Sequence, residues 1–237
     1  MENLSRRTFL AFTAGAALAP SLSWAADLVP SLLDHILLGC NDLERGIAFV
    51  EEHAGVRAAF GGVHPGRGTQ NALLALGTRR YLEIIAPDPK QSSVGQYSVI
   101  KNLKEPGLIG WAAHRDDLDQ FAERLRQNGV ACEGPQPGAR QRPDGKVLRW
   151  KALRLKNDHG GLLPFFIEWS KDSIHPSVDA PKGCTLRRFE ANTPEIEDFL
   201  TAASRVELDL RALSAKASEA SLLATISGPK GEFTIAS

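Results

Sequence analysis

The sequence predicts an α+β fold built from two tandem βαβββ units, with a fainter third, partial copy of the unit at the C-terminus. Three observations predict this fold. Short apolar runs typical of buried strands alternate with segments of helical spacing, the same order of elements occurs twice, and the two copies align at similar offsets. The chain has 237 residues, which is enough for one sizeable domain or two small ones that share a core.

The first unit begins with an apolar run at 35–40, which is typical of a buried strand. Asn41 and Asp42 then offer an N-cap, and the apolar residues that follow have helical spacing until Gly55 ends the helix. The last strand of the unit runs into Pro87, which cannot continue a strand ladder. The three strands that complete the unit are expected at 57–63, 70–76 and 81–86.

The second unit repeats this order. A strand is expected at 108–113, followed by a helix that is capped at Asp116 and Asp117 and closed by Gly129. A polar loop rich in Pro and Gly covers 134–146. Two more strands are expected, at 147–155 and 163–169.

The two units align at two places. Asp42 placed on Asp117 gives an offset of 75 residues, and Glu83 placed on Glu168 gives an offset of 85. The loop at 134–146 absorbs the difference of ten. We therefore expect Glu83 and Glu168 to occupy matching positions in the last strands of their units.

The third copy, over 183–237, is fainter. Thr193 is expected as an N-cap with Pro194 at the first helical position. The segment 212–224 fits a helix as well as it fits strands. The strands of this unit are expected at 185–191, 208–213, 221–226 and 232–235.

The first residues are typical of an export signal. A pair of arginines precedes an apolar stretch at 9–19, which is too short to span a bilayer of about 30 Å. Small residues at Ser23 and Ala25 suit a signal peptidase. The segment 1–25 resembles a twin-arginine signal peptide, which implies export of the folded protein to the periplasm and cleavage after Ala25. A chance Arg-Arg pair in an ordinary general-secretion signal is the alternative.

The composition excludes several classes of partner and site. Lys and Arg number 28, as do Asp and Glu, so no basic excess is available to neutralise the phosphates of a nucleic acid. After residue 25 no apolar segment is long enough to provide a stable membrane anchor. The three cysteines have no spacing typical of a disulfide framework or of a thiolate zinc site, and they are Cys40, Cys132 and Cys184.

The repeated unit and several longer stretches resemble the glyoxalase-like domain family of the vicinal-oxygen-chelate superfamily, which includes glyoxalase I, extradiol dioxygenases and the fosfomycin- and bleomycin-resistance proteins. The resemblance covers about 33–176, and it implies a cup-shaped mixed β-sheet around a pocket. The expected domains are a signal peptide at 1–25, a glyoxalase-like domain at 26–178 with units at 33–89 and 107–176, and the C-terminal unit at 183–237. The stretches that carry the resemblance are 34–36, 61–73, 81–89, 110–112, 142–145 and 162–169.

The resemblance also implies a metal centre. The superfamily's ligand positions fall on His35, Glu83, Gly110 and Glu168. Imidazole and carboxylate donors suit a divalent Zn, Ni, Fe or Mn ion with positions left open for substrate oxygens. Gly110 has no side chain, so one imidazole of the family pattern is missing, and water or a histidine such as His64 or His114 would have to replace it. The expected ligands are therefore His35, Glu83 and Glu168.

Other residues are candidates because of where they lie in the predicted elements. Glu83 and Glu168 interrupt apolar strands, where an ionised carboxylate needs a cation, a hydrogen bond or a salt bridge to arginine. Together with Glu83, His64 is a candidate acid or base, because it lies in a Gly-rich loop expected beside the pocket. The candidate substrate-binding residues are Asn71, Trp111 and Arg149, although Trp111 also suits simple core packing and Arg149 could pair with a substrate carboxylate.

Two functions remain open at this point. The first is an exported, metal-assisted lyase, isomerase or dioxygenase that acts on a small oxygenated metabolite. The second is a metal-free protein that binds or sequesters a small molecule in the same cup. In either case the partner is a small molecule, and the C-terminal unit at 183–237 could form a homodimer or cover the cup.

Overall fold

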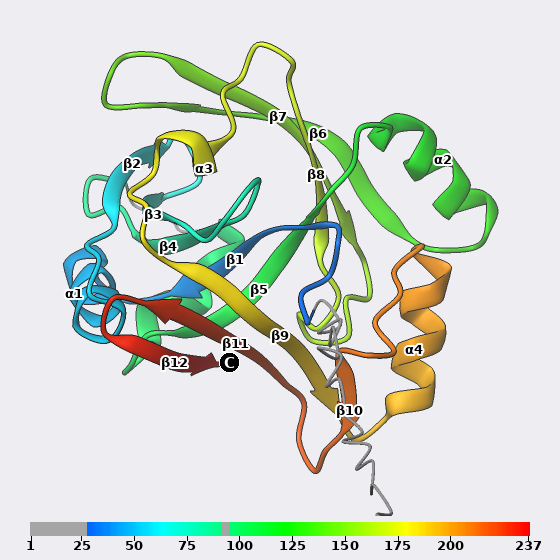
Figure 1. Cartoon of the computed structure of the whole chain (residues 1–237). Helices are drawn as coiled ribbons and strands as arrows, with labels where there is room; N and C mark the ends of the chain where they lie inside the picture. The colour runs from blue at the N-terminus through cyan, green and yellow to red at the C-terminus, as the bar shows by residue number, and fades with distance from the viewer. Residues whose placement is uncertain (1–27, 92–94) are drawn as a thin grey trace, which may run out of the picture.

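The centre of the protein is a closed eight-stranded barrel. The structure is a computed structural model that describes residues 28–91 and 95–237. Two βαβββ units of the predicted order form the barrel, so the predicted tandem fold is confirmed (Figure 1). The first unit comprises β1 (Leu33–Gly39), α1 (Leu43–Ala54), β2 (Ala59–His64), β3 (Thr69–Ala75) and β4 (Tyr81–Pro87). The second unit comprises β5 (Gly107–His114), α2 (Leu118–Gln127), β6 (Cys132–Gln141), β7 (Val147–Leu155) and β8 (Phe165–Trp169).

The two units pair their strands in the same way. The strand order around the barrel is β1-β4-β3-β2-β6-β7-β8-β5. In each unit the first strand pairs parallel with the last, as β1 does with β4 and β5 with β8. The units join through an antiparallel pairing of β1 with β5 and, on the opposite side, through one pair between β2 and β6. Alternate residues of every strand therefore face one common interior.

Local sequence signals account for the first helix. The Asp42 side chain accepts a hydrogen bond from the Arg45 N–H at 3.0 Å, as an N-cap does. Gly55 ends the helix with φ of 79°, a left-handed conformation that costs glycine little. The apolar side of α1 packs against the barrel and contains the buried residues Leu43, Ile47, Val50 and Ala54.

The prediction of a loop at 134–146 is wrong for most of that range, because the strand β6 covers Cys132–Gln141. This strand pairs with β7 from Cys132 to Gln141, but it pairs with β2 only where Val63 meets Gln141. Prolines are tolerated where one side of a strand has no ladder to maintain. Pro135 and Pro137 are therefore compatible with this strand, although the Pro- and Gly-rich composition of the segment predicted a loop.

Two short helices complete the barrel region. The 3-10 helix η1 (Gly95–Asn102) lies between the two units. The helix α3 (Pro176–Asp179) follows β8 and packs against β3. Its neighbour Ala180 is buried in a small apolar cluster with Leu73, Ala75 and Tyr81.

The C-terminal unit has the predicted order of elements but a different pairing. Its sheet has the order β10-β9-β11-β12, and its first strand pairs parallel with the second strand rather than with the last. The helical alternative for 212–224 is wrong, because β10 and the start of β11 lie there, and 208–213 forms no strand. The elements are β9 (Thr185–Thr193), α4 (Ile196–Arg205), β10 (Ser214–Lys216), β11 (Ser221–Gly228) and β12 (Gly231–Ala236). Thr193 accepts a hydrogen bond from the Glu195 N–H, so α4 begins two residues later than expected.

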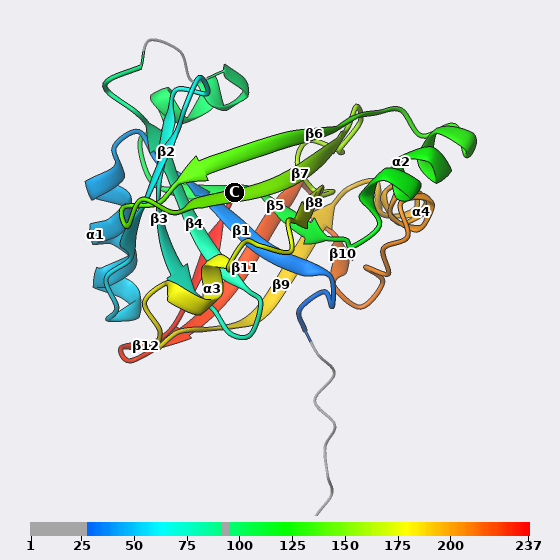
Figure 2. The ribbon, with the colours of Figure 1, turned by 90° about the horizontal axis from the view of Figure 1, so that it is seen from above.

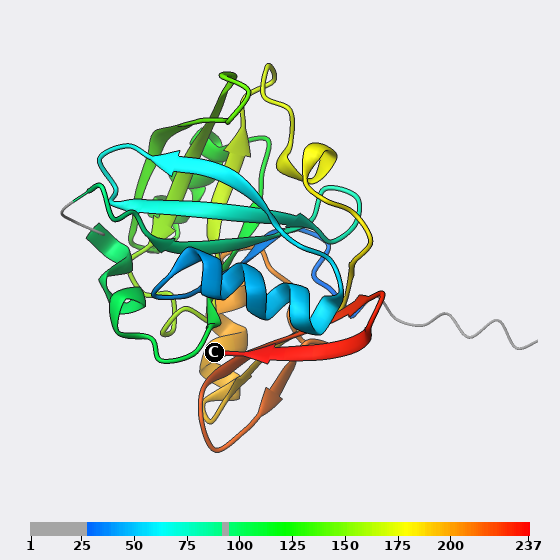
Figure 3. The ribbon, with the colours of Figure 1, turned by 90° about the vertical axis from the view of Figure 1, so that its left-hand side faces the viewer.

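This sheet packs on the outside of the barrel. It contacts α1 and β5, and Figures 2 and 3 show it beneath the barrel with α1 beside the β11–β12 hairpin. Trp111 of β5 packs on Phe189 of β9, with ring centroids 5.1 Å apart. None of the residues that line the barrel pocket belongs to this sheet, so the C-terminal unit does not cover the cup. Its role in a homodimer stays a prediction.

The predicted signal peptide at 1–25 lies outside the described residues. Within the described part of the chain, every helix is too short or too polar to cross a membrane.

Candidate functional site

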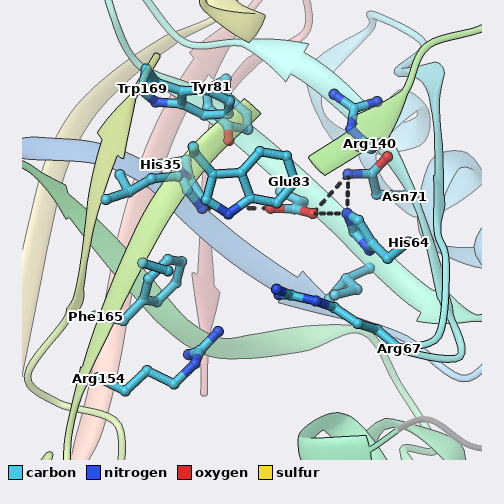
Figure 4. Close-up of a pocket in the computed structure, with 14 residues that line it drawn as sticks. His35, His64, Arg67, Asn71, Tyr81, Glu83, Arg140, Arg154, Phe165 and Trp169 are labelled. Carbon is cyan, nitrogen blue, oxygen red and sulfur yellow. Dashed lines mark hydrogen bonds and ion pairs between the residues drawn. The ribbon is translucent and has the colours of Figure 1, made fainter. Parts of the chain in front are cut away.

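The barrel interior contains a pocket that is open at one end. It contains about 520 Å³ of space not filled by protein atoms, a figure that includes the open solvent at its mouth. Aromatic side chains form part of its wall, and ionisable groups converge between them (Figure 4). The lining residues are His35, His64, Arg67, Asn71, Tyr81, Glu83, Ile85, Arg140, Trp150, Ala152, Arg154, Phe165, Ile167 and Trp169.

Glu83 lies at the centre of this pocket. Strand alternation turns it inward together with Tyr81 and Ile85, and the residue is only 8% exposed. Its Oε1 accepts a hydrogen bond from Asn71 Nδ2 at 2.7 Å, and its Oε2 lies 3.5 Å from His35 Nε2. Burial opposes ionisation, but attraction to the imidazoles and the Asn71 hydrogen bond outweigh it and lower the pKa of Glu83. Glu83 is therefore an ionised carboxylate inside the barrel.

His35 is held by two aromatic contacts and by one ring nitrogen. Its Nδ1 lies 2.7 Å from Asp34 Oδ1, so this nitrogen donates to the carboxylate and Nε2 points toward Glu83. The ring stacks on Tyr81 with centroids 4.5 Å apart, and Phe165 meets it edge-on. The position of Nε2 is therefore fixed before any ligand binds.

Asp34 is the anchor of this arrangement and is completely buried. Besides His35, it accepts hydrogen bonds from Trp169 Nε1 and from His175 Nε2, each at 3.1 Å. Burial opposes ionisation of Asp34, but the hydrogen bonds from His175 and His35 hold the pKa of its carboxyl well below the usual range. A buried charge with three N–H donors is satisfied, so Asp34 can orient His35 permanently.

His64 lies on the other side of Glu83. Its Nε2 is 3.7 Å from Glu83 Oε1 and 3.4 Å from Asn71 Nδ2, while its Nδ1 contacts Thr69 Oγ1 at 2.9 Å. Burial, together with repulsion from nearby guanidinium groups, lowers the pKa of His64 to about 4 despite the attraction of Glu83. At neutral pH the ring is uncharged, and Nε2 can accept the Asn71 N–H. Asn71, expected to bind substrate, thus bridges His64 and Glu83 at the pocket wall.

The structure contradicts the expected position of Glu168. The interior residues of β8 are Phe165, Ile167 and Trp169, so Glu168 faces outward. Its Oε2 accepts a hydrogen bond from the Leu118 N–H at 2.8 Å, at the first turn of α2. The Asp117 side chain, at the N-cap position, makes no capping hydrogen bond. Glu168 therefore caps the N-terminus of α2 in its place.

We predict that Glu168→Ala lowers the free energy of unfolding by about 1 kcal/mol, the usual size of a lost helix cap. The Leu118 N–H would lose its acceptor, and the start of α2 would lose a negative charge. Urea unfolding compares this variant with Glu123→Ala, which removes an exposed glutamate from the same helix. An equal effect of the two substitutions, or a change in the His35 and His64 NMR signals in Glu168→Ala alone, would contradict the capping role.

Two expected substrate-binding residues also lie elsewhere. Trp111 is 1% exposed, packs on the C-terminal sheet and donates its Nε1–H to the Leu162 carbonyl. The structure therefore supports the alternative that Trp111 is a core-packing residue. Arg149 is on the outer face of β7, where it is exposed and lies 3.9 Å from Asp172. The inward residues of this strand are Trp150, Ala152 and Arg154.

The predicted metal centre does not fit this arrangement. Glu168 is on the outer face, and Gly110 contributes no donor. His64 brings a second imidazole, but Figure 4 shows it on the opposite side of the Glu83 carboxylate from His35. Across residues 28–91 and 95–237, no three His, Cys, Asp or Glu side chains are grouped so that they could hold a metal ion. The donor set thus lacks the convergence that a Zn, Ni, Fe or Mn site requires.

Sequence reasoning missed several residues of the site. Asp34 stands next to His35 in the sequence, and this adjacency is a signal that could have been used. Arg67 lies in the same Gly-rich loop as His64. Arg140 and Arg154 occupy strands whose inward faces could not be assigned, and His175 comes from the segment that follows β8 and leads into α3.

Comparisons with known proteins agree with the fold. The sequence pattern of a family described as glyoxalase-like domain matches residues 33–207. A hypothetical protein from Staphylococcus aureus has 17% identity and a TM-score of 0.62, over 86% of this chain and 84% of that one. Methylmalonyl-CoA epimerase from Mycobacterium tuberculosis has 27% identity and a TM-score of 0.44, over 62% of this chain and 92% of that one. No curated protein matches the sequence.

Proposed function

The chain belongs to the glyoxalase-like domain family, and we propose that its barrel pocket binds a small oxygenated molecule and moves a proton on it. The reaction class is that of an isomerase or a lyase. The observation that carries the proposal is Glu83, an ionised carboxylate that is 8% exposed and faces the pocket between two imidazoles. Burying an ionised carboxylate costs free energy, and a role in proton transfer would explain why this one lies inside the pocket.

Glu83 acts as the base in this proposal. Its carboxylate accepts a proton from an O–H group of the ligand or from a C–H group next to a carbonyl. The electron pair of the broken bond stays on the ligand, on the hydroxyl oxygen in the first case and on the carbonyl oxygen of an enolate in the second. The proton then returns from Glu83 to the ligand, either to a different atom or to the other face of the same atom. No electrons are gained or lost overall, so the step needs no oxidant or reductant.

The surrounding residues prepare Glu83 for this role. Asn71 donates to Oε1, which holds the carboxylate in place and leaves Oε2 toward His35. Asp34 fixes the orientation of the His35 ring, so Nε2 faces the Glu83 carboxylate, whose charge changes when it accepts the proton.

Binding without chemistry is the second candidate. The aromatic wall favours it, because Tyr81, Trp150, Phe165 and Trp169 would hold a planar or apolar ligand by contact alone. In that case Glu83 would only orient the ligand. The two candidates differ in whether the ligand leaves the pocket unchanged.

Deuterium incorporation separates these functions. The protein is incubated in D2O with a bacterial metabolite extract, and mass spectrometry compares wild type with Glu83→Gln. We expect wild type to add deuterium to at least one small oxygenated metabolite, and we expect Glu83→Gln to lower that rate by about 10³-fold. Incorporation that is equal in both proteins, or absent in wild type, would contradict a proton-transfer function for Glu83.

We also propose that the protein works in the periplasm after export. The basis is the segment 1–25, with its paired arginines and its apolar stretch. Cell fractionation of a strain that produces the whole chain tests this, with Arg6→Lys and Arg7→Lys combined as the variant that should stay in the cytoplasm.

A further inference from the structure

A second hollow adjoins the barrel pocket. It contains about 490 Å³ of space not filled by protein atoms, a figure that includes the open solvent at its mouth. Phe165 and Arg154 line both spaces, so the hollow and the pocket are neighbours. Both residues lie on the His35 side of the pocket (Figure 4). The proton transfer proposed for Glu83 gives this adjoining hollow no role.

The lining of the hollow is mainly apolar. Apart from Arg154 and Asp158, the described residues that form it are apolar or glycine. Leu37, Leu155 and Leu163 belong to this lining, and each of them is at most 9% exposed. An apolar wall of this kind gains free energy when an apolar group replaces the water against it.

Strand pairing places the hollow next to Glu83. Glu83 of β4 pairs with Leu37 of β1, and Leu37 pairs on its other side with Gly110 of β5. Glu83 lines the pocket, whereas Leu37 and Gly110 line the hollow, so one row of residues crosses from the first space to the second. Neighbouring strands lie about 4.8 Å apart, which puts Gly110 about 10 Å from Glu83 along this row. One small molecule can therefore reach both.

Gly110 keeps the hollow open. Its φ is 147°, and a Cβ at this position would meet nothing within 4 Å. A side chain here would thus extend into unfilled space beside Leu37. Gly110 contributes no donor to a metal centre, but it does contribute room.

Phe165 forms the boundary between the two spaces. Its ring meets the His35 ring edge-on, with centroids 5.5 Å apart, and the Arg154 guanidinium lies 4.6 Å from its centroid. Phe165 is only half-buried. Its ring therefore offers an apolar surface that leads from His35 to the hollow.

We infer that the hollow binds a hydrocarbon chain of the ligand, so that the substrate of this site has an oxygenated head at Glu83 and an apolar arm. Gly110 is then the residue that determines how large an arm the site accepts. The inference rests on the proposed function for the position of the head, and it names the substrate class for that function.

Calorimetric titration of the whole protein with two diols tests the arm. The probes are butane-1,2-diol and octane-1,2-diol, which share an oxygenated head and differ in chain length. Neither has a C–H group next to a carbonyl, so the titration reports binding rather than reaction. We expect octane-1,2-diol to bind at least about 10-fold more tightly, because its chain buries apolar surface in the hollow. Equal affinities, or no binding of octane-1,2-diol, would overturn the inference.

Variants at Gly110 locate the arm. We expect Gly110→Leu to weaken binding of octane-1,2-diol by at least about 10-fold and to leave butane-1,2-diol unchanged, because leucine fills the hollow. Gly110→Ala is the matched control, since it carries the same backbone strain at φ 147° but adds one methyl group. Its loss should not exceed about 4-fold. Equal losses in the two variants would assign the effect to backbone strain and would count against the arm.

Leu37→Phe provides a second variant if Gly110→Leu does not fold. Leu37 belongs to β1 and lines the same hollow, so a larger side chain fills space there without a left-handed backbone. We expect it to reduce the affinity ratio of the long to the short diol by about 10-fold. An unchanged ratio would show that the chain lies elsewhere.

Glu83→Gln keeps this test separate from the test of the proposed function. Glutamine retains the size of the head site, so we expect the preference for octane-1,2-diol to persist while deuterium incorporation is lost. A preference for the long diol without incorporation in wild type would reject the proton-transfer function and leave the arm intact. Incorporation in wild type without such a preference would reject the arm alone.

Discussion

Asp34→Ala is expected to destabilise the fold by about 3–5 kcal/mol, the usual cost of removing one partner from a buried charged group. Asp34 is completely buried and accepts N–H bonds from His35, Trp169 and His175. Alanine would leave three buried donors without an acceptor. It would also free the His35 ring, whose direction depends on the bond at Nδ1.

Urea unfolding at neutral pH measures this effect. Asp42→Ala is the control, because Asp42 accepts a single exposed hydrogen bond at the start of α1 and should cost about 1 kcal/mol. A loss in Asp34→Ala no larger than in Asp42→Ala would mean that the hydrogen bonds of Asp34 do not stabilise the fold as a buried charged network should. Asp34→Asn provides a folded variant if alanine prevents folding, and it should show altered His35 NMR signals.

The stability of the protein is expected to fall as the pH is lowered from 6.5 toward 4, because His64 must stay uncharged in the folded state. Burial lowers the pKa of His64 from 6.5 to about 4. Between these values the unfolded chain binds a proton at this residue and the folded chain does not, so stability rises with pH across the window. The shift corresponds to a change of about 3 kcal/mol in the free energy of unfolding.

His64→Gln checks the origin of this dependence. Glutamine cannot titrate, yet it retains an oxygen and an amide that can meet Asn71 and Thr69. We expect urea unfolding of this variant to show a flatter dependence on pH between 6.5 and 4 than wild type. The same slope in both proteins would assign the effect to other groups. Exposed His53→Gln is the control, and its slope should match that of wild type.

The periodic parts of the sequence predicted the fold well. Both barrel units follow from apolar runs and caps, and the cap at Asp42 and the stop at Gly55 are where they were expected. The Pro- and Gly-rich composition of 134–146 wrongly predicted a loop, because a strand that pairs mainly on one side tolerates Pro135 and Pro137. The pairing of the third unit depends on long-range contacts that its weak pattern does not encode.

The candidate site was predicted in part. His35, His64, Asn71 and Glu83 do meet in one pocket. Glu168 does not join them, because an alignment that differs by one residue moves a strand side chain to the opposite face of the sheet. No alternation rule could reveal this, since both faces of β8 carry large apolar residues.

The remaining site residues come together only through the three-dimensional fold. Asp34 and His175 are 141 positions apart in the sequence, and α3 and the segment before it bring them into contact. Arg67 and Arg154 belong to different units and line the same pocket because the barrel closes. Contacts of this kind depend on strand register and on loop paths, which a single sequence does not specify.

The ionisation of Glu83 inside the barrel is the central claim, and carbon NMR of its carboxyl group tests it most directly. With glutamate labelled at the carboxyl carbon, the Glu83 signal is the one that disappears in Glu83→Gln. We predict that it stays at the position of an ionised carboxylate from pH 7 to below 4.5, the ordinary glutamate value, because attraction to His35, the hydrogen bond from Asn71 and attraction to Arg140 stabilise the charge. A carboxyl signal that titrates above pH 4.5 would show that burial dominates, and it would contradict the account.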